Sequence, residues 1–199
     1  MTAMLTRQAD DCIAAGVAES ALAASLLPGN ALALWRRRLP EPLRAALRNI
    51  ALDAVDDLDF TIAPPIGPAT LALKLALAGY EERAAVALAG DMLRLARVQA
   101  EISGADRLRI RLEVVESDGC WKFHADYVTR RLLTTYVGQG TQWAMADDRE
   151  RIGQMAAGEV GIFKGRLLLA QPPLLHRSPP IGDSGEQRLL LAIDPAAEG

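Results

Sequence analysis

The sequence predicts an α+β protein in which N-terminal helices pack on a C-terminal jelly-roll barrel, the double-stranded β-helix. Two observations favour this class. The first hundred residues are rich in Ala and Leu, whereas the last hundred contain short apolar or β-branched runs separated by Gly and Pro. We therefore expect a mainly helical supporting region over residues 1–104 and a jelly-roll region over residues 105–199, joined in one compact domain.

Two helices are expected in the first region. The later one buries Leu88, Met92 and Leu95 on one face and ends at Ser103 and Gly104. The earlier one begins at Pro42 and ends before a proline break at residues 63–65, with these apolar residues at helical spacing: Leu43, Leu47, Ile50, Ala54 and Leu58. Both stripes are typical of core-facing helix surface.

Strands are expected from residue 107 onward, where the hydrophobic period becomes two. Leu108, Ile110 and Leu112 alternate there with charged residues, as in a half-buried strand. Further strands are expected over residues 121–125, 131–137, 141–144, 159–164, 174–177 and 188–194.

The composition excludes several classes of protein. Of the 199 residues 50% are hydrophobic and 24% charged, and the net charge of -3 lacks the basic excess of non-specific nucleic-acid binding. The run from Trp35 to Arg38 is short and is typical of a solvated face or surface ion pairs. No apolar window is long enough to span a bilayer. We expect neither nucleic-acid nor membrane partners.

The cysteines indicate the compartment. Cys12 and Cys120 lie far apart in the sequence and form no disulfide framework, and the N-terminus lacks the order of a signal peptide. We therefore expect a cytoplasmic protein.

The two histidines, His124 and His176, are the most informative residues. On a regular strand His124 and Asp126 would share one face, and a later strand of a closed double sheet can return beside it. Two imidazoles and one carboxylate leave coordination positions open on a metal ion, which suits non-haem Fe(II) oxygenases. Each residue alone also has an ordinary interpretation, a buried histidine or a capping carboxylate.

Cys120 leaves a different metal site open. It precedes His124 by four residues and could add a soft fourth ligand. A closed site of Cys, His, Asp and His favours zinc and a structural or storage role.

The chain resembles a bacterial family defined only as a domain of unknown function. Members of that family are sometimes encoded beside GTP-dependent zinc metallochaperones, which implies a role in metal homeostasis. The resemblance covers most of the chain and rests on five motifs: Trp121-Lys122-Phe123-His124-Ala125-Asp126, Thr135-Tyr136-Val137-Gly138, Gly140-Thr141, Phe163-Lys164-Gly165 and His176-Arg177-Ser178-Pro179-Pro180.

More distantly, the order of these motifs is similar to that of Fe(II)- and 2-oxoglutarate-dependent dioxygenases, particularly the prolyl-hydroxylase-like branch, whose barrel is cupin-like. This resemblance implies that His124, Asp126 and His176 hold iron. It further implies that Arg188 pairs with the distal carboxylate of 2-oxoglutarate and that Tyr136 donates a hydrogen bond to the same group.

Arg188 and Tyr136 also have ordinary interpretations. Arg188 could form an ion pair with Glu186 or Asp183, and Tyr136 could be a packing residue. The segment of residues 179–187, between the distal histidine and Arg188, is longer than the pattern leads one to expect.

Two functions follow as hypotheses. The first is a metal-dependent oxygenase of the Fe(II)/2-oxoglutarate type that hydroxylates a small-molecule or protein substrate. The alternative is a non-catalytic protein that binds zinc or another divalent metal in metal homeostasis, with Cys120 as an additional ligand.

Overall fold

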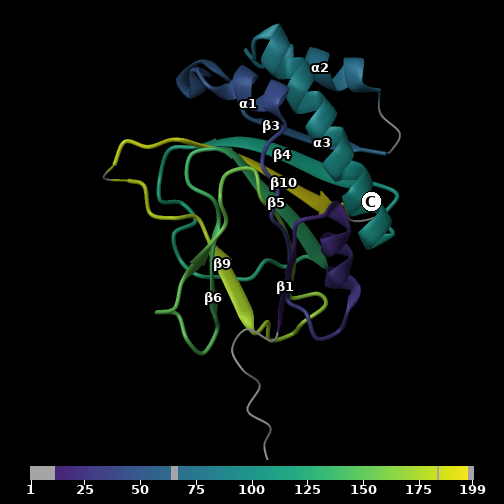
Figure 1. Ribbon diagram of the computed structural model, residues 1–199, viewed down its shortest axis with the longest axis vertical. Coiled ribbons are helices and arrows are strands. Elements are labelled where there is room, and N and C mark those ends of the chain that lie inside the picture. The colour runs from purple at the N-terminus through teal and green to yellow at the C-terminus, as the bar shows by residue number, and fades with distance from the viewer. Residues whose placement is uncertain (1–11, 64–66, 183, 197–199) are drawn as a thin grey trace, which may run out of the picture.

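Two β-sheets form the centre of the computed structural model, which describes residues 12–63, 67–182 and 184–196 (Figure 1). A seven-stranded sheet has the order β1-β2-β8-β5-β10-β4-β3, and a three-stranded sheet has the order β7-β6-β9. Neighbouring strands are antiparallel except β1 and β2, which are parallel. The strands are β1 (Ile13–Gly16), β2 (Leu32–Trp35), β3 (Leu58–Ile62), β4 (Leu108–Val115), β5 (Arg130–Val137), β6 (Gln142–Met145), β7 (Gly153–Gln154), β8 (Val160–Lys164), β9 (Leu174–Arg177) and β10 (Arg188–Pro195).

Helices cover one face of the large sheet, as Figure 1 shows for α3 above β4 and β10. The helices α1 and α2 contact α3. Helical segments are η1 (Glu19–Leu26), α1 (Glu41–Leu47), η2 (Leu52–Ala54), α2 (Pro68–Leu77) and α3 (Glu82–Ser103). None of the helices in the described ranges combines the length and apolar composition needed to cross a membrane.

Strand alternation divides the core into two clusters. On β10, Leu189, Leu191 and Ile193 belong to the cluster beneath the helices, whereas Ala192 belongs to a smaller cluster on the other face of the sheet. Leu174 of β9 belongs to the smaller cluster, so the three-stranded sheet packs there. The protein is a mixed α/β structure dominated by one large sheet, with helices on one face and a small sheet on the other.

Several expected elements are confirmed. The helix α3 ends at Ser103, and Gly104 adopts the left-handed conformation with φ of 67°, which glycine accommodates without strain. The strands β4, β5, β6, β8, β9 and β10 lie where the alternation predicts them.

Other expectations are wrong. The helix beginning near Pro42 ends at Leu47, and a short 3-10 turn and β3 replace its second half. Residues 121–125 form no strand, and only His124 makes a bridge there. The expected proline break at residues 64 and 65 lies outside the described residues.

The first region also contributes β1, β2 and β3 to the large sheet, although its Ala- and Leu-rich sequence indicates helices. All four residues of β2 are buried, so the strand has no polar face to reveal a period of two. The division of the chain near residue 104 remains a prediction.

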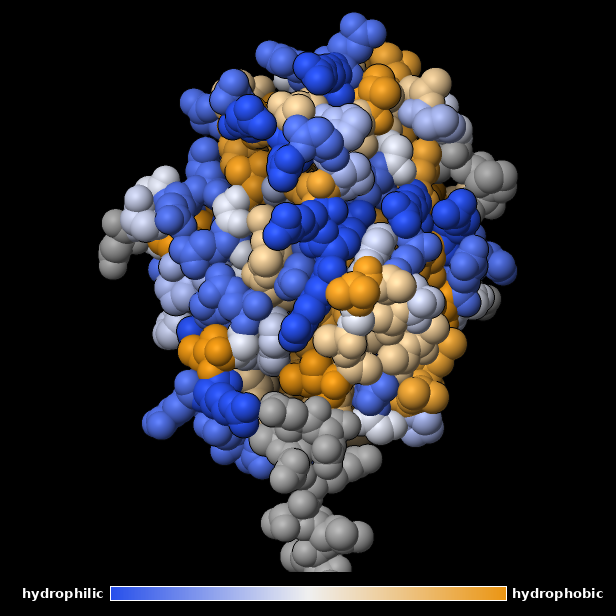
Figure 2. All heavy atoms as spheres, viewed as in Figure 1, coloured by the Kyte–Doolittle hydropathy of each residue, from blue (hydrophilic) through white to orange (hydrophobic). Residues whose placement is uncertain are grey.

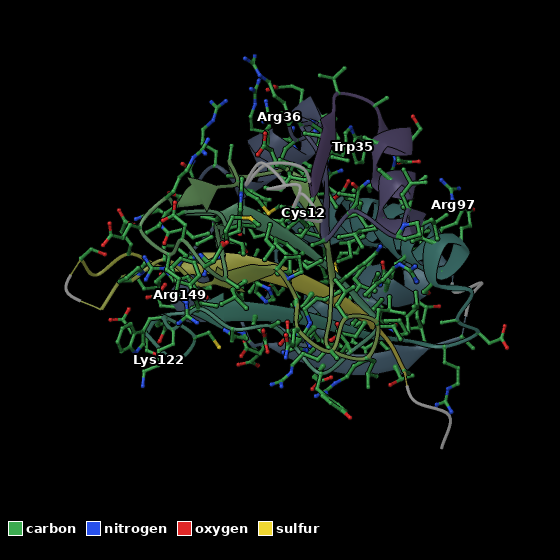
Figure 3. All side chains as sticks on the ribbon, turned by 90° about the horizontal axis from the view of Figure 1, so that it is seen from below. Cys12, Trp35, Arg36, Arg97, Lys122 and Arg149 are labelled. Atoms are coloured by element: carbon green, nitrogen blue, oxygen red, sulfur yellow. The ribbon has the colours of Figure 1, made fainter. Side chains whose placement is uncertain are left out.

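Figure 2 shows hydrophilic and hydrophobic side chains interspersed on one face. Arg36, Arg97, Lys122 and Arg149 reach outward in Figure 3, whereas Cys12 lies in the interior. In the arginine run at residues 36–38 only Arg37 is buried.

Candidate metal centre

Three candidate ligands converge between the two sheets. His124 and Asp126 belong to the irregular segment between β4 and β5, and His176 belongs to β9. The backbones of His124 and His176 exchange hydrogen bonds of 3.0 and 2.9 Å. Their ring nitrogens and a carboxylate oxygen of Asp126 all lie within 4.8 Å of one another. The bridge, rather than the regular strand we expected, brings the three residues together.

The carboxylate of Asp126 has one occupied and one unsatisfied oxygen. Oδ1 forms an ion pair with Arg131 at 2.5 Å. Oδ2 is buried and accepts no hydrogen bond, because the Nε2 of His176, 2.9 Å away, approaches it without hydrogen-bond geometry. Burial raises the pKa of the Asp126 carboxyl, but contact with His176 and the charge of Arg131 outweigh this and bring it to about 2. The Nε2 of His124 lies 3.7 Å from Oδ1. A buried anionic oxygen without a donor, next to two imidazoles, fits a divalent metal ion.

The imidazoles are oriented for ligation. The Nδ1 of His124 lies 2.8 Å from the carbonyl oxygen of Lys122 and donates to it, which leaves Nε2 as the acceptor. The ring of His176 lies 4.8 Å from the rings of both His124 and Phe163. Burial lowers the pKa of His176, which favours the neutral form that binds metals.

A glycine allows the chain to pass beneath the ligand segment. A Cβ at Gly165 would lie 2.7 Å from the carbonyl oxygen of Asp126 and closer still to that of Val128. The amide of Arg166 donates to the Asp126 carbonyl at 2.8 Å. The turn after β8 therefore supports the backbone that carries Asp126, which explains the glycine of the Phe163-Lys164-Gly165 motif.

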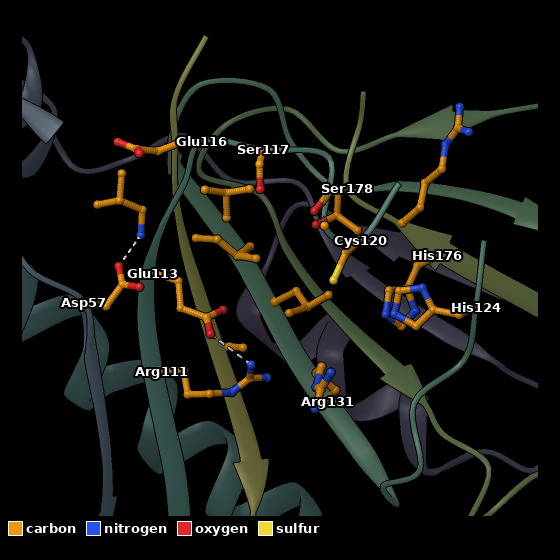
Figure 4. Close-up of a pocket in the computed structure, with 18 residues that line it drawn as sticks. Asp57, Arg111, Glu113, Glu116, Ser117, Cys120, His124, Arg131, His176 and Ser178 are labelled. Carbon is orange, nitrogen blue, oxygen red and sulfur yellow. Dashed lines mark hydrogen bonds and ion pairs between the residues drawn. The ribbon is translucent and has the colours of Figure 1, made fainter. Parts of the chain in front are cut away.

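A cavity of about 280 Å³ opens beside the candidate ligands. His124, His176 and Arg131 line one end, with Cys120 and Ser178 next to them (Figure 4). Asp57, Glu113 and Glu116 lie at the other end, and Arg111 and Ser117 also line the cavity. The cavity leaves room for small molecules next to the candidate metal position.

Arg188 is buried behind this cavity. Its guanidinium donates to the carbonyl oxygen of Gln139 at 2.5 Å, to the hydroxyl of Ser178 at 2.8 Å and to that of Thr135 at 3.2 Å. Within the described ranges no carboxylate forms an ion pair with it; Glu186 accepts instead from Gln139, and Asp183 lies outside these ranges. Burial lowers the pKa of Arg188 to about 10. Ser178 connects this guanidinium to the cavity wall.

Tyr136 is not brought to the cavity. Its hydroxyl donates to the Oδ2 of Asp91 at 2.9 Å, in the core beneath the helices, where Arg37 also binds Asp91. Tyr136 shares its face of β5 with Leu132, whereas Leu133 lines the cavity. The packing interpretation of Tyr136 agrees with this position.

Cys120 lines the cavity but does not join the ligand cluster. Its side chain is exposed, and among the described residues the cluster of metal-ligating atoms comprises only His124, Asp126 and His176. The closed four-ligand arrangement is therefore not formed here.

Three residues at the centre were missed by sequence reasoning. Arg131 holds Asp126, while Thr135 and Ser178 bind Arg188. The sequence carries only weak indications of these positions. Thr135 lies on the same face of β5 as Leu133, and Ser178 follows His176 by two residues, which places both on one face of an extended segment.

Comparison with solved structures indicates the fold. A dioxygenase for auxin oxidation from rice superposes with a TM-score of 0.57 at 14% identity, covering 93% of this chain and 82% of that one. This likeness shows an oxygenase-like fold. Two further structures match. One is an Arabidopsis thaliana dioxygenase for auxin oxidation in complex with 2-oxoglutarate, with a TM-score of 0.49 at 12% identity, covering 94% of this chain and 92% of that one. The other is a Pseudomonas putida prolyl-4-hydroxylase, with a TM-score of 0.48 at 20% identity, covering 89% of this chain and 100% of that one.

No curated protein shows significant similarity to the chain. The model of a family described as "Protein of unknown function (DUF1826)" matches residues 17–194, which is most of the chain. The chain belongs to the DUF1826 family.

Proposed function

We propose that the protein is an oxygenase that depends on Fe(II) and 2-oxoglutarate and hydroxylates a carbon atom of its substrate. The observation that carries this proposal is the unsatisfied Oδ2 of Asp126, 2.9 Å from the Nε2 of His176 beside a cavity, with the Nε2 of His124 3.7 Å from the other oxygen of the same carboxylate. The two facing sheets would form a jelly-roll barrel around this cavity, with the helices outside it.

The three side chains supply a suitable ligand set. Asp126 would bind through Oδ2, and His124 through the Nε2 that its bond to Lys122 leaves free. Three protein ligands on one side leave positions for a cosubstrate and for dioxygen. When bound, Fe(II) and 2-oxoglutarate would supply the oxidising chemistry, in which 2-oxoglutarate, O₂ and a substrate C–H yield succinate, CO₂ and a substrate C–OH.

Arg188 is the proposed anchor of 2-oxoglutarate. Its guanidinium has no carboxylate partner in the described part of the chain. A carboxylate of the cosubstrate would accept two parallel hydrogen bonds from it and balance its charge. The hydroxyls of Thr135 and Ser178 hold its orientation. Leu133 and Ala192 are apolar residues of the adjoining cavity wall.

The test is an anaerobic titration of apoprotein with Fe(II) and then 2-oxoglutarate. We expect a visible charge-transfer band that requires both additions and is lost in His124→Ala. Arg97→Ala, an exposed residue on α3, is the matched control and should retain the band. Absence of the band in the folded wild-type protein would refute the assignment.

The location of Cys120 favours one alternative, a non-catalytic zinc protein. Cys120 lines the same cavity as the two histidines and could reach a metal ion after a change of its loop. This alternative predicts that Cys120→Ser strongly weakens zinc binding and that no band forms with Fe(II) and 2-oxoglutarate. The oxygenase predicts a band that survives Cys120→Ser.

The substrate and the compartment remain proposals. The small cavity favours a small molecule or a single side chain of a protein, and the charge of -3 argues against nucleic acid. We propose the cytoplasm as the compartment.

A further inference from the structure

Arg131 occupies an unusual position between two carboxylates. Its Nε and one terminal nitrogen bind the two oxygens of Asp194 at 2.7 and 2.8 Å. Its other terminal nitrogen lies 2.5 Å from the Oδ1 of Asp126. Side-chain exposure is 17% for Arg131 and 7% for Asp194, so water screens the pair little. One rigid guanidinium thus connects β10 to a candidate metal ligand.

The sheet fixes this guanidinium in place. Leu132 of β5 pairs with Ile193 of β10, which sets Arg131 beside Asp194. Arg111 of β4 approaches the same Asp194 at 3.5 Å and binds Glu113 at 3.1 Å. Because Asp194 is held from two strands, the fork of Arg131 has one orientation.

We propose that Arg131, positioned by Asp194, makes Asp126 a one-oxygen metal ligand. Arg131 pairs with Oδ1, from which the Nε2 of His124 lies 3.7 Å away, and leaves Oδ2, 2.9 Å from the Nε2 of His176, as the oxygen for a metal ion. A carboxylate that cannot bind through both oxygens leaves one more coordination position open for cosubstrate or dioxygen. This inference rests on the proposed metal site and assigns two positioning residues to it.

A purely structural ion pair is the competing explanation, and the chain offers a matched control. Arg109 of β4 binds Asp59 of β3 through a similar fork, with its Nε 2.9 Å from Oδ1. That pair also joins neighbouring strands of the large sheet but touches none of the three ligands. A role in sheet stability alone would lower the thermal midpoint without changing metal binding, and more for the buried Arg131 pair than for the Arg109 pair, whose side chains are 53% and 50% exposed.

The test uses Co(II) as a spectroscopic probe in the full-length protein. Wild type, Arg131→Lys, Asp194→Asn, the double variant and Arg109→Lys are compared by Co(II) affinity, visible absorption and thermal midpoint. A lysine keeps the charge but cannot hold two carboxylates in fixed geometry. We expect Arg131→Lys to lower Co(II) affinity by about 10- to 100-fold, because loss of a residue that orients a metal ligand has an effect of this size. We also expect the visible absorption band of Co(II) to weaken, because Asp126 can then bind the metal through both oxygens.

Asp194→Asn conserves shape and should shift affinity and spectrum in the same direction, which keeps the test valid if Arg131→Lys fails to fold. Since Asp194 acts through Arg131, the double variant should lose no more affinity than Arg131→Lys. Arg109→Lys should leave affinity and spectrum unchanged. The inference is overturned if wild type binds Co(II) and the folded variants change only the thermal midpoint. If wild type binds no Co(II), the metal site itself is wrong, which is a different failure.

Discussion

Arg188 occupies a position that costs stability unless a ligand supplies an opposite charge. A guanidinium with no exposed surface and only neutral partners has lost its hydration without gaining an opposite charge. Burial lowers its pKa to about 10, so it stays charged at neutral pH. This environment is the one expected of an arginine to which a ligand supplies the missing anion.

We predict that Arg188→Lys lowers the affinity for 2-oxoglutarate at least about tenfold and leaves Fe(II) affinity unchanged, because the lysine ammonium replaces a fork with a point charge. Anaerobic calorimetric titration of apoprotein with Fe(II), and then of the metal-loaded protein with 2-oxoglutarate, measures the two affinities. Arg130→Lys is the control, since burial also lowers the pKa of Arg130 but its guanidinium donates to the carbonyl oxygen of Ser25, whereas that of Arg188 donates to the cavity-lining Ser178. Equal 2-oxoglutarate affinity in wild type and Arg188→Lys would contradict the role.

Sequence reasoning found His124, Asp126 and His176 because histidine is scarce in this chain, so two of them in strand-rich surroundings stand out. It could not find Arg131, since arginine is common and its contact with Asp194 depends on the register of β5 against β10. Short polar side chains such as Thr135 likewise become informative only when a tertiary partner is seen.

At the scale of an element, alternate residues of β5 point to opposite faces of the sheet, one toward the cavity and the other toward the helices. Leu133 and Thr135 face the cavity side, whereas Leu132 and Tyr136 face the helices. The hydroxyl of Tyr136 reaches Asp91 of α3 there, and burial and the charge of Asp91 raise its pKa well above the usual value. A shift of one residue along the strand therefore decides whether a side chain packs beneath the helices or faces the cavity side.

We predict that Tyr136→Phe lowers the free energy of unfolding by about 1.5–3 kcal/mol, the range for a buried hydrogen bond to a charged group. Urea denaturation measures this loss. The affinity for 2-oxoglutarate should not change, because Tyr136 lies across the sheet from the cavity. A fall in that affinity with little loss of stability would restore the role that the family resemblance implied for Tyr136.

The elements that could be predicted from the sequence have a regular hydrophobic pattern within their own length. The helix α3 spans 22 residues with a clear apolar stripe and a glycine stop, and β4 alternates over its whole length. Short segments were misread where tertiary contacts override local preference: β1 is Ile-Ala-Ala-Gly, and α1 ends after seven residues. Residues 121–125 alternate like a strand, but only His124 finds a partner strand.

At the scale of the molecule, the two core clusters are unequal. The cluster beneath the helices includes most of α3 and strands on both sides of β10, whereas the cluster on the other face is much smaller. The three-stranded sheet has short strands, of two residues in β7 and four each in β6 and β9. His176 lies on this sheet, so the candidate metal centre joins the weakest layer to the segment preceding β5.

Metal binding should therefore stabilise the structure unevenly. A ligand that binds only the folded arrangement adds about 2.7 kcal/mol at a hundredfold excess over Kd. We predict that Fe(II) or Zn(II) slows amide hydrogen exchange most in β6, β9 and the segment around His124, with smaller changes in α3. Exchange measured by mass spectrometry with and without metal tests this, and His124→Ala should remove the difference. Uniform protection across α3 and β9, or protection that persists in His124→Ala, would place the metal elsewhere.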